Sequence, residues 1–225
     1  MNVVVNAATS VDGKLSSRER RQVAISGDDD FERVDALRAD ADAVMVGVGT
    51  VLADDPSLTV RSDERVAARE GRGESAQPAR VVADSRARTP PDAAVVDDSA
   101  QTYVLVGADA PGDRRARLGT DTTEVVEAGG ERVDLAAGLD ALESRGVSEL
   151  MVEGGGELVF SLFDAGLVDE LTVYVGSKVI GGRDAPTLAD GDGFREPDFV
   201  DLELEDVDRV DDGVLLAYDV EDANE

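Results

Sequence analysis

Three consecutive glycines in the segment VEGGGEL, residues 152–158, are the strongest local signal for binding chemistry in this sequence. They follow the apolar run ELMV and precede a helical pattern of leucine, valine and phenylalanine. Glycine lets the backbone approach a ligand closely, and the first N–H groups of a helix attract phosphate. The pattern is neither G-x-G-x-x-G nor a P-loop. Alone, it indicates either a phosphate-binding turn or a tight strand-to-helix connection without a ligand.

Two other segments place polar side chains beside apolar runs. GVGTVLADDP, residues 47–56, puts the Thr50 hydroxyl and the Asp54 carboxylate after a buried run. It also fits an ordinary glycine turn in which Asp54 caps a nearby N–H. NAATSVDGK, residues 6–14, puts Asn6 inside a strand, where a buried amide needs partners, and Lys14 behind an Asp-Gly turn. Alone, this segment also fits a polar strand end with a solvent-exposed lysine.

The chain contains no His and no Cys, which removes several kinds of catalysis. A Ser-His-Asp triad, a histidine base, a thiol nucleophile and an ordinary zinc site each need one of these residues. We therefore predict no metal site. A zinc deaminase is excluded because its ligands are missing. Carboxylates, hydroxyls, amides, arginines and whatever a bound cofactor brings remain for catalysis.

The elements that would position these residues alternate between apolar strands and amphipathic helices. We expect strands at residues 2–8, 43–47, 80–84, 103–107, 123–126, 149–153 and 171–175, and helices at 28–41, 135–145 and 157–165. Residues 201–206 and 213–220 read as two further strands around a turn at Asp211-Asp212-Gly213. This order predicts an α/β fold: a mostly parallel central sheet flanked by helices, with a C-terminal antiparallel hairpin. We expect a single domain over residues 1–225, with 62–77 as a flexible surface excursion.

The net charge of the chain limits the kinds of molecule that it can bind. The chain has 50 acidic and 22 basic residues, a net charge of −28, and only two of the basic residues are lysines. Such a surface repels phosphates, so we expect no nucleic-acid partner. An acidic, lysine-poor surface is typical of salt-loaded cytoplasms, where the Debye length is ~3 Å at ~1 M salt. We see neither a membrane-spanning run nor a secretory signal, and therefore expect a cytoplasmic protein with no membrane partner.

Taken together, the segments resemble one known family. VNAATSVDGK, ALRADADAVMVGVGTVLADDPSLTVR, RVVADS, VEGGGELVFSL and VDELTVYV have the order and spacing of the reductase of riboflavin biosynthesis, from residue 2 to about residue 188. The resemblance implies a dihydrofolate-reductase-like fold, NADPH (with NADH possible) as the cofactor, a phosphorylated ribosylaminopyrimidine as the small-molecule substrate, and a homodimer. Because this chain lacks the zinc ligands of the deaminase often fused to bacterial members, the resemblance points to the archaeal and fungal substrate. That substrate is 2,5-diamino-6-ribosylamino-4(3H)-pyrimidinone 5′-phosphate.

The resemblance also assigns roles to positions. The implied cofactor contacts are Ala8, Thr50, Asp54, Ser85, Gly154, Gly155, Gly156, Glu157 and Leu158. The implied substrate contacts are Asn6, Asp12, Arg38, Leu58, Arg61 and Glu153. Arg38 and Arg61 suit a phosphate or a carbonyl-rich pyrimidine through charge-assisted hydrogen bonds, although they also fit surface arginines that balance carboxylates. Segment 22–26 departs from the bacterial pattern, which has a Ser and a Trp there.

The implied reaction opens the ribose to an imine or carbonyl form, adds hydride to its anomeric carbon and adds a proton to nitrogen. Glu153 and Lys14 are the catalytic candidates for polarising or protonating the substrate. Solvent is an equal alternative as the proton source, and Glu153 also suits binding of ring N–H groups without proton transfer. Arg86 and Arg88, next to Ser85, could supply the positive charge that a cofactor 2′-phosphate needs, although they also fit a surface pair in an acidic shell.

Three alternatives stay open. A dihydrofolate reductase would share the fold and cofactor but reduce a pterin. A bacterial-type enzyme would reduce the deaminated analogue, 5-amino-6-(5-phosphoribosylamino)uracil. Arg38, Arg61 and the E-G-G turn favour a ribosyl phosphate over a pterin, and the missing deaminase ligands favour the diamino form. A nucleotide-binding protein without turnover is the non-enzymatic alternative.

Overall fold

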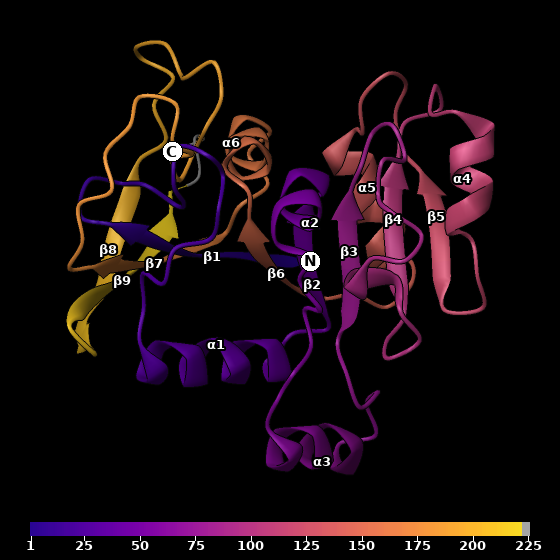
Figure 1. Ribbon diagram of the computed structural model, residues 1–225, viewed down its shortest axis with the longest axis horizontal. Coiled ribbons are helices and arrows are strands. Elements are labelled where there is room, and N and C mark those ends of the chain that lie inside the picture. The colour runs from indigo at the N-terminus through magenta and orange to yellow at the C-terminus, as the bar shows by residue number, and fades with distance from the viewer. Residues whose placement is uncertain (222–225) are drawn as a thin grey trace. The chain divides into compact units, whose positions relative to one another are not determined.

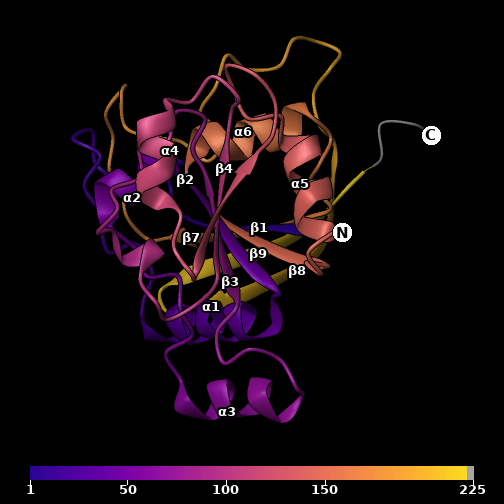
Figure 2. The same cartoon turned by 90° about the vertical axis from the view of Figure 1, so that its right-hand side faces the viewer.

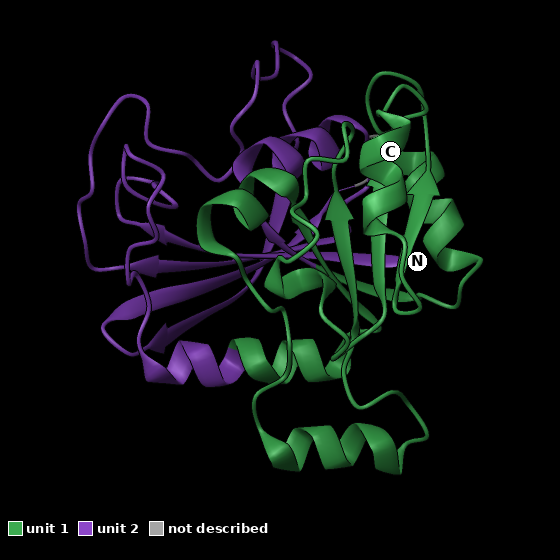
Figure 3. Ribbon diagram, turned by 45° about the vertical axis from the view of Figure 1, so that its right-hand side comes forward, with its two compact units in different colours: residues 1, 34–151 green, residues 2–33, 152–225 purple. Residues whose placement is uncertain are grey.

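The computed structural model describes residues 1–221 (Figure 1). The chain forms two compact units, one of residue 1 and residues 34–151, the other of residues 2–33 and the chain from 152 onward (Figure 3). Helix α1 (Asp28–Asp40) and strand β6 (Glu149–Gly154) pass from one unit to the other. The single domain expected over residues 1–225 stays a prediction, and its last four residues lie outside the described part.

The first unit is built on four parallel strands. They are β2 (Ala43–Gly47), β3 (Ala79–Ala83), β4 (Thr102–Val106) and β5 (Thr123–Glu127), paired in that order. Their short, β-branched sequences are typical of strands buried on both faces. Helices α2 (Val48–Asp54) and α4 (Gly112–Leu118) lie on one side of these strands and α5 (Leu135–Glu143) on the other (Figure 2). The core between the strands, α2 and α4 includes Val44, Val46, Val51, Val82, Val104, Val106 and Leu118.

Segment 62–77, expected to be a flexible excursion, contains helix α3 (Asp63–Gly71). Its anchor is Arg69, which is 3% exposed. The Arg69 guanidinium donates to the carbonyls of Ala39, Ala41 and Ser75 at 2.8, 2.9 and 3.0 Å. The prediction missed this helix because a buried arginine, not an apolar stripe, holds it. No helix within residues 1–221 has both the length and the apolar composition needed to cross a membrane.

The second unit joins an early and a late segment of the chain. Strand β1 (Asn2–Ser10) pairs in parallel with β7 (Glu170–Gly176), which pairs antiparallel with β9 (Gly213–Val220), and β9 pairs antiparallel with β8 (Leu202–Val210). Helix α6 (Gly156–Asp164) follows β6. The predicted α/β fold, mostly parallel with a C-terminal antiparallel hairpin, is therefore confirmed.

The turn of this hairpin caps helix α1. The Asp211 carboxylate accepts the N–H groups of Asp29 and Asp30 at 3.2 and 3.1 Å. Gly27 contributes the first backbone bond, because its carbonyl accepts the N–H of Phe31 at 3.1 Å. The sequence predicted the start of this helix at residue 28, as observed, but not its cap. The capping carboxylate comes from a residue that is distant in the sequence, which local patterns do not report.

Candidate active site

The glycine turn between β6 and α6 has a backbone that requires glycine at its start. Gly154 has a φ of +131°, a conformation that residues with a side chain rarely adopt. A Cβ placed on Gly154 would meet nothing within 4 Å, so the space beside it is open. Gly155 stands at the N-cap of α6 without a side-chain cap. The exposed Glu157 lies in the first turn of the helix, and the half-buried Glu153 precedes the turn.

Gly156 is required for a different reason. A Cβ on this residue would lie 2.2 Å from the carbonyl oxygen of Thr187 and 2.7 Å from the Cβ of Asp190. The N–H of Asp190 donates to the Gly156 carbonyl at 3.0 Å. Gly156 therefore allows residues 187–190 to pack against the start of the helix. Leu158 is 7% exposed and its N–H donates to the Gly155 carbonyl at 2.9 Å, so it is part of the helix and the core.

Lys14 lies beside the same segment. It forms an antiparallel bridge with Thr187, and its Nζ donates to the Ala185 carbonyl at 3.3 Å. The second unit thus brings Lys14 and the glycine turn to two sides of residues 185–190. In this arrangement the Lys14 ammonium is tied to a backbone carbonyl, which orients it.

Two candidate substrate residues of β1 and the turn after it have partners in the protein. The Asn6 side-chain oxygen accepts from Arg33 at 2.8 Å, and Arg33 also pairs with Asp30 at 2.8 Å. The Asp12 carboxylate accepts the Ser10 hydroxyl at 2.7 Å and the N–H groups of residues 180 and 181. These hydrogen bonds lower the pKa of Asp12 to about 2. Ala8, the implied backbone contact, pairs with Tyr174 of β7.

Thr50 and Asp54 lie on helix α2, not in a loop as the glycine-containing sequence suggested. The helix starts directly after β2, with Gly47 at its N-cap, and ends at Asp55, which has a left-handed φ of 43°. Thr50 is half-buried and Asp54 is exposed at the last position. Desolvation by the surrounding protein raises the pKa of Asp54. Asp55, and not Asp54, caps a backbone group, since its carboxylate accepts the N–H of Ala94 at 2.8 Å.

The turn after β3 holds Ser85 and is organised by Asp84, a residue the sequence analysis did not single out. Asp84 is fully buried, and its carboxylate accepts both the N–H and the hydroxyl of Thr89, at 2.7 and 2.8 Å. The Ser85 hydroxyl oxygen accepts the N–H of Val133 at 3.0 Å. A pattern of Asp followed by Thr five residues later was the available signal.

Three arginines surround this turn. The exposed Arg86 pairs with Glu131 at 3.3 Å. The Arg88 Nε lies 3.9 Å from a carboxylate oxygen of Asp84, and Arg114 donates to the Arg86 carbonyl at 3.5 Å. The structure therefore places three guanidinium groups near Ser85, two of them beside the carboxylates of Glu131 and Asp84. Arg114 was missed because it lies on α4, a helix that the sequence analysis did not predict.

The candidate substrate residues Arg38, Leu58 and Arg61 meet in the first unit. Arg38 on α1 donates to the Thr59 carbonyl at 3.0 Å, which places it against the chain segment that carries the other two. Leu58 is 1% exposed with a φ of 55°, whereas Arg61 is exposed.

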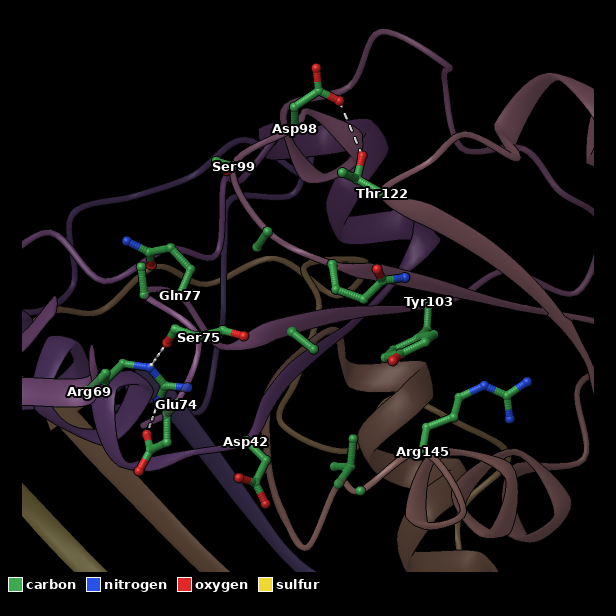
Figure 4. Close-up of a pocket in the computed structure, with 16 residues that line it drawn as sticks. Asp42, Arg69, Glu74, Ser75, Gln77, Asp98, Ser99, Tyr103, Thr122 and Arg145 are labelled. Atoms are coloured by element: carbon green, nitrogen blue, oxygen red, sulfur yellow. Dashed lines mark hydrogen bonds and ion pairs between the residues drawn. The ribbon is translucent and has the colours of Figure 1, made fainter. Parts of the chain in front are cut away.

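A pocket of about 460 Å³ in the first unit lies elsewhere (Figure 4). Its lining includes Ala79, Gln101 and Thr122, at the amino ends of β3, β4 and β5. Ligands of open α/β sheets bind at the opposite, carboxyl ends. Polar groups of the lining bond to one another, as between Thr122 and Asp98 at 3.1 Å, and none of the predicted site residues lines this pocket. Within residues 1–221 no cluster of three or more metal-ligating side chains occurs.

Comparison with known proteins decides the family. The family model described as the RibD C-terminal domain matches residues 1–216, nearly the whole chain. The chain belongs to the RibD C-terminal domain family. The resemblance stated from the sequence motifs is thereby confirmed.

Two relatives of this RibD-type chain are named as reductases. It is 46% identical over 95% of both chains to "2,5-diamino-6-ribosylamino-4(3H)-pyrimidinone 5′-phosphate reductase" of Archaeoglobus fulgidus. It is 44% identical over 97% of both chains to the protein of the same name in Methanothermobacter thermautotrophicus. Among solved structures, a pyrimidine reductase-like protein from Corynebacterium diphtheriae superposes with a TM-score of 0.83 at 21% identity, covering 98% of this chain and 92% of that one. The RibD-type fold is therefore shared.

Proposed function

We propose that this chain reduces the ribosylamino side chain of 2,5-diamino-6-ribosylamino-4(3H)-pyrimidinone 5′-phosphate to the ribitylamino form with NADPH, in riboflavin biosynthesis. The observation that carries the proposal is 46% and 44% identity, over nearly the full length of both chains, to two proteins named for this reaction. The family model, which matches residues 1–216, spans every position of the candidate site. A cytoplasmic location is part of the same proposal.

Each of the two units, taken by itself, offers groups that suit a dinucleotide. Gly154 leaves open space beside the start of α6, where helix N–H groups favour phosphate. Thr50 and Ser85 offer hydroxyls at the carboxyl ends of β2 and β3, the edge where α/β sheets bind ligands. When bound, NADPH supplies the hydride. The chain supplies placement of the reacting groups and the electrostatic surroundings, which is why a protein without His or Cys can serve.

On the substrate side, the Arg38 and Arg61 guanidinium groups would hold the phosphate or the pyrimidine carbonyl. Glu153 would accept hydrogen bonds from ring N–H groups. Lys14, oriented by the Ala185 carbonyl, is the candidate for polarising the opened sugar or donating a proton, with solvent as the alternative donor.

The preference for NADPH over NADH would come from the arginines around Ser85. Arg86, Arg88 and Arg114 concentrate positive charge where a net charge of −28 would otherwise repel a 2′-phosphate. Measuring KM for both cofactors with the wild type and with Arg86→Ala and Arg114→Ala tests this. We expect the variants to lose affinity for NADPH and not for NADH. Equal catalytic efficiency of the wild type with both cofactors would reject it.

One assay separates the candidate functions. The absorbance of reduced nicotinamide is followed with the diamino pyrimidine phosphate, with its deaminated uracil analogue and with dihydrofolate. We expect the fastest oxidation with the diamino compound, because the two relatives are named for it. Faster turnover of the uracil form or of dihydrofolate would replace the proposed substrate. Binding of the cofactor without turnover of any of them would favour a nucleotide-binding protein.

The β8–β9 hairpin supports a homodimer. The register places Leu204 opposite Tyr218 and Val207 opposite Leu216, so these four side chains share one face. Leu204 and Val207 are 51% and 52% exposed. The register places Glu203, Asp206, Asp208 and Asp219 on the opposite face, and Glu205 falls in the bulge between Leu204 and Asp206, where it has no cross-strand partner. An exposed apolar face to which the register assigns no carboxylate suits contact with a second copy.

Light scattering after size exclusion in molar salt tests the dimer. We expect a dimer for the wild type and a monomer for Leu204→Asp combined with Val207→Asp. A matched control is Glu203→Gln on the other face, which should leave the dimer intact. A monomeric wild type at micromolar concentration would reject the proposal.

A further inference from the structure

Residues 58–62 belong to no helix or strand, yet their backbone is held at several points. The side chain of Gln77 pairs with Val60 as a strand neighbour would: it accepts the N–H at 2.7 Å and donates to the carbonyl at 3.1 Å. Arg38 donates to the carbonyl of Thr59 at 3.0 Å. Side chains therefore fix a segment that would otherwise be a free loop.

The remaining anchor is Asp35, on helix α1, which is 7% exposed. One carboxylate oxygen accepts the N–H of Arg61 at 2.6 Å, and the other accepts the N–H of Ser62 at 3.2 Å and the Arg65 guanidinium at 3.1 Å. Burial by itself would raise the pKa of Asp35, but these N–H donors outweigh it and lower the pKa. Asp35 is therefore ionised at neutral pH and grips two consecutive peptide groups.

These hydrogen bonds determine the direction in which the Arg61 side chain leaves the backbone. A carboxylate that binds the N–H groups of residues 61 and 62 leaves little freedom for the peptide planes on both sides of the Arg61 Cα. The Arg61 side chain itself is exposed, and no ion pair of this side chain is found within residues 1–221. The Cα–Cβ bond of Arg61 thus starts from a fixed direction, and the exposed guanidinium at the end of the side chain is available to an anion from solution.

We propose that Asp35 is a positioning residue for substrate recognition: by holding the peptides of Arg61 and Ser62, it directs the Arg61 guanidinium toward the phosphorylated pyrimidine. Gln77 assists by holding Val60. This inference rests on the proposed function, since it assumes that Arg61 binds that substrate. Preorganising one arginine lowers the conformational cost of binding and acts on the substrate, not on the cofactor.

The test compares Asp35→Asn with wild type and with Asp63→Asn, a matched change at an exposed position on α3. An asparagine can accept one of the two N–H groups but turns its own NH₂ group toward the other donors. We expect KM for the diamino pyrimidine phosphate to rise about tenfold, because a charged acceptor of two backbone N–H groups is lost. KM for NADPH should change less than about twofold, and Asp63→Asn should match the wild type in both.

Amide hydrogen exchange gives a readout that is independent of turnover. Exchange at Arg61 and Ser62 should accelerate in Asp35→Asn and not in Asp63→Asn. If Asp35→Asn does not fold, Gln77→Glu serves in its place, because it keeps the acceptor for the Val60 N–H and loses the donor to the Val60 carbonyl. The same rise in the pyrimidine KM is then expected, with faster exchange at Val60.

Faster exchange with an unchanged pyrimidine KM would overturn the inference. An equal rise in both KM values would also overturn it, because it would show a general structural role. A wild type that reduces neither pyrimidine would refute the proposed function itself, whatever the exchange shows, so the two failures are distinguishable.

Discussion

Substituting Gly156 by alanine tests the account of the glycine turn. The new Cβ would lie 2.2 Å from the Thr187 carbonyl oxygen, about 1 Å inside an ordinary contact, and 2.7 Å from the Asp190 Cβ. Both neighbours belong to the backbone or lie next to it, so residues 187–190 must move. The hydrogen bond from the Asp190 N–H to the Gly156 carbonyl is then strained as well. Overpacking of this kind costs about 1–3 kcal/mol, with more possible when backbone is displaced.

Thermal unfolding in molar potassium chloride, followed by circular dichroism, measures the effect. For a chain of this length, each kcal/mol lowers Tm by about 2–4 °C, so a fall of about 2–12 °C is expected. Gly71→Ala at the end of α3 is the matched control, because nothing lies within 4 Å of its added Cβ and its φ is not positive. That variant should melt at or slightly above the wild-type temperature, since alanine favours a helix.

An unchanged Tm for Gly156→Ala would refute the reasoning. It would mean that residues 187–190 do not pack against the helix start, and Gly156 would then need an explanation from ligand binding alone. A crystal structure of the variant with residues 187–190 in place would lead to the same conclusion.

Three further predictions follow from charge and site. The Tm should rise between dilute buffer and molar salt, because screening weakens repulsion within a chain of net charge −28. A Tm that does not change with salt would contradict the interpretation of the acidic surface as typical of a salt-loaded cytoplasm. Burial, with the hydrogen bond from its hydroxyl to Asp212, raises the pKa of Tyr174 to about 12 from 10.0. The unfolded chain therefore loses this proton first, so the free energy of unfolding should fall as pH rises from 10 to 12; denaturant titrations should show this slope in the wild type and a smaller one in Tyr174→Phe. Glu153→Gln should raise the pyrimidine KM or lower kcat, and steady-state values equal to the wild type would remove Glu153 from both proposed roles.

Much of the sheet was readable from the sequence. Strand β2 was predicted with its observed bounds, because the short apolar run AVMVG follows a polar helix end. The hairpin of β8 and β9 was found from its Asp-Asp-Gly turn, although β8 extends to Val210, beyond the predicted residue 206. These features are encoded locally, so composition and turn residues suffice to place them.

Other features depend on contacts between distant residues. Helix α2 was hidden because Gly47 and Gly49 look like a turn, whereas burial of Val48 and Val51 stabilises the helix. Helix α3 depends on Arg69 reaching carbonyls about thirty residues away. At the candidate site, the motifs were located correctly in the sequence, but Asp35 was unremarkable among the acidic residues of its helix. Its importance lies in the backbone N–H groups that its carboxylate binds, and only the tertiary structure shows which ones these are.

The cap of α1 by Asp211 has a consequence for biosynthesis. Until residue 211 has left the ribosome, the start of this helix lacks the carboxylate that binds the N–H groups of Asp29 and Asp30. In a nascent chain that ends before residue 211, the first turn of this helix would therefore fray more than in the complete protein. The cap of this helix can therefore form only after almost the whole polypeptide has been translated.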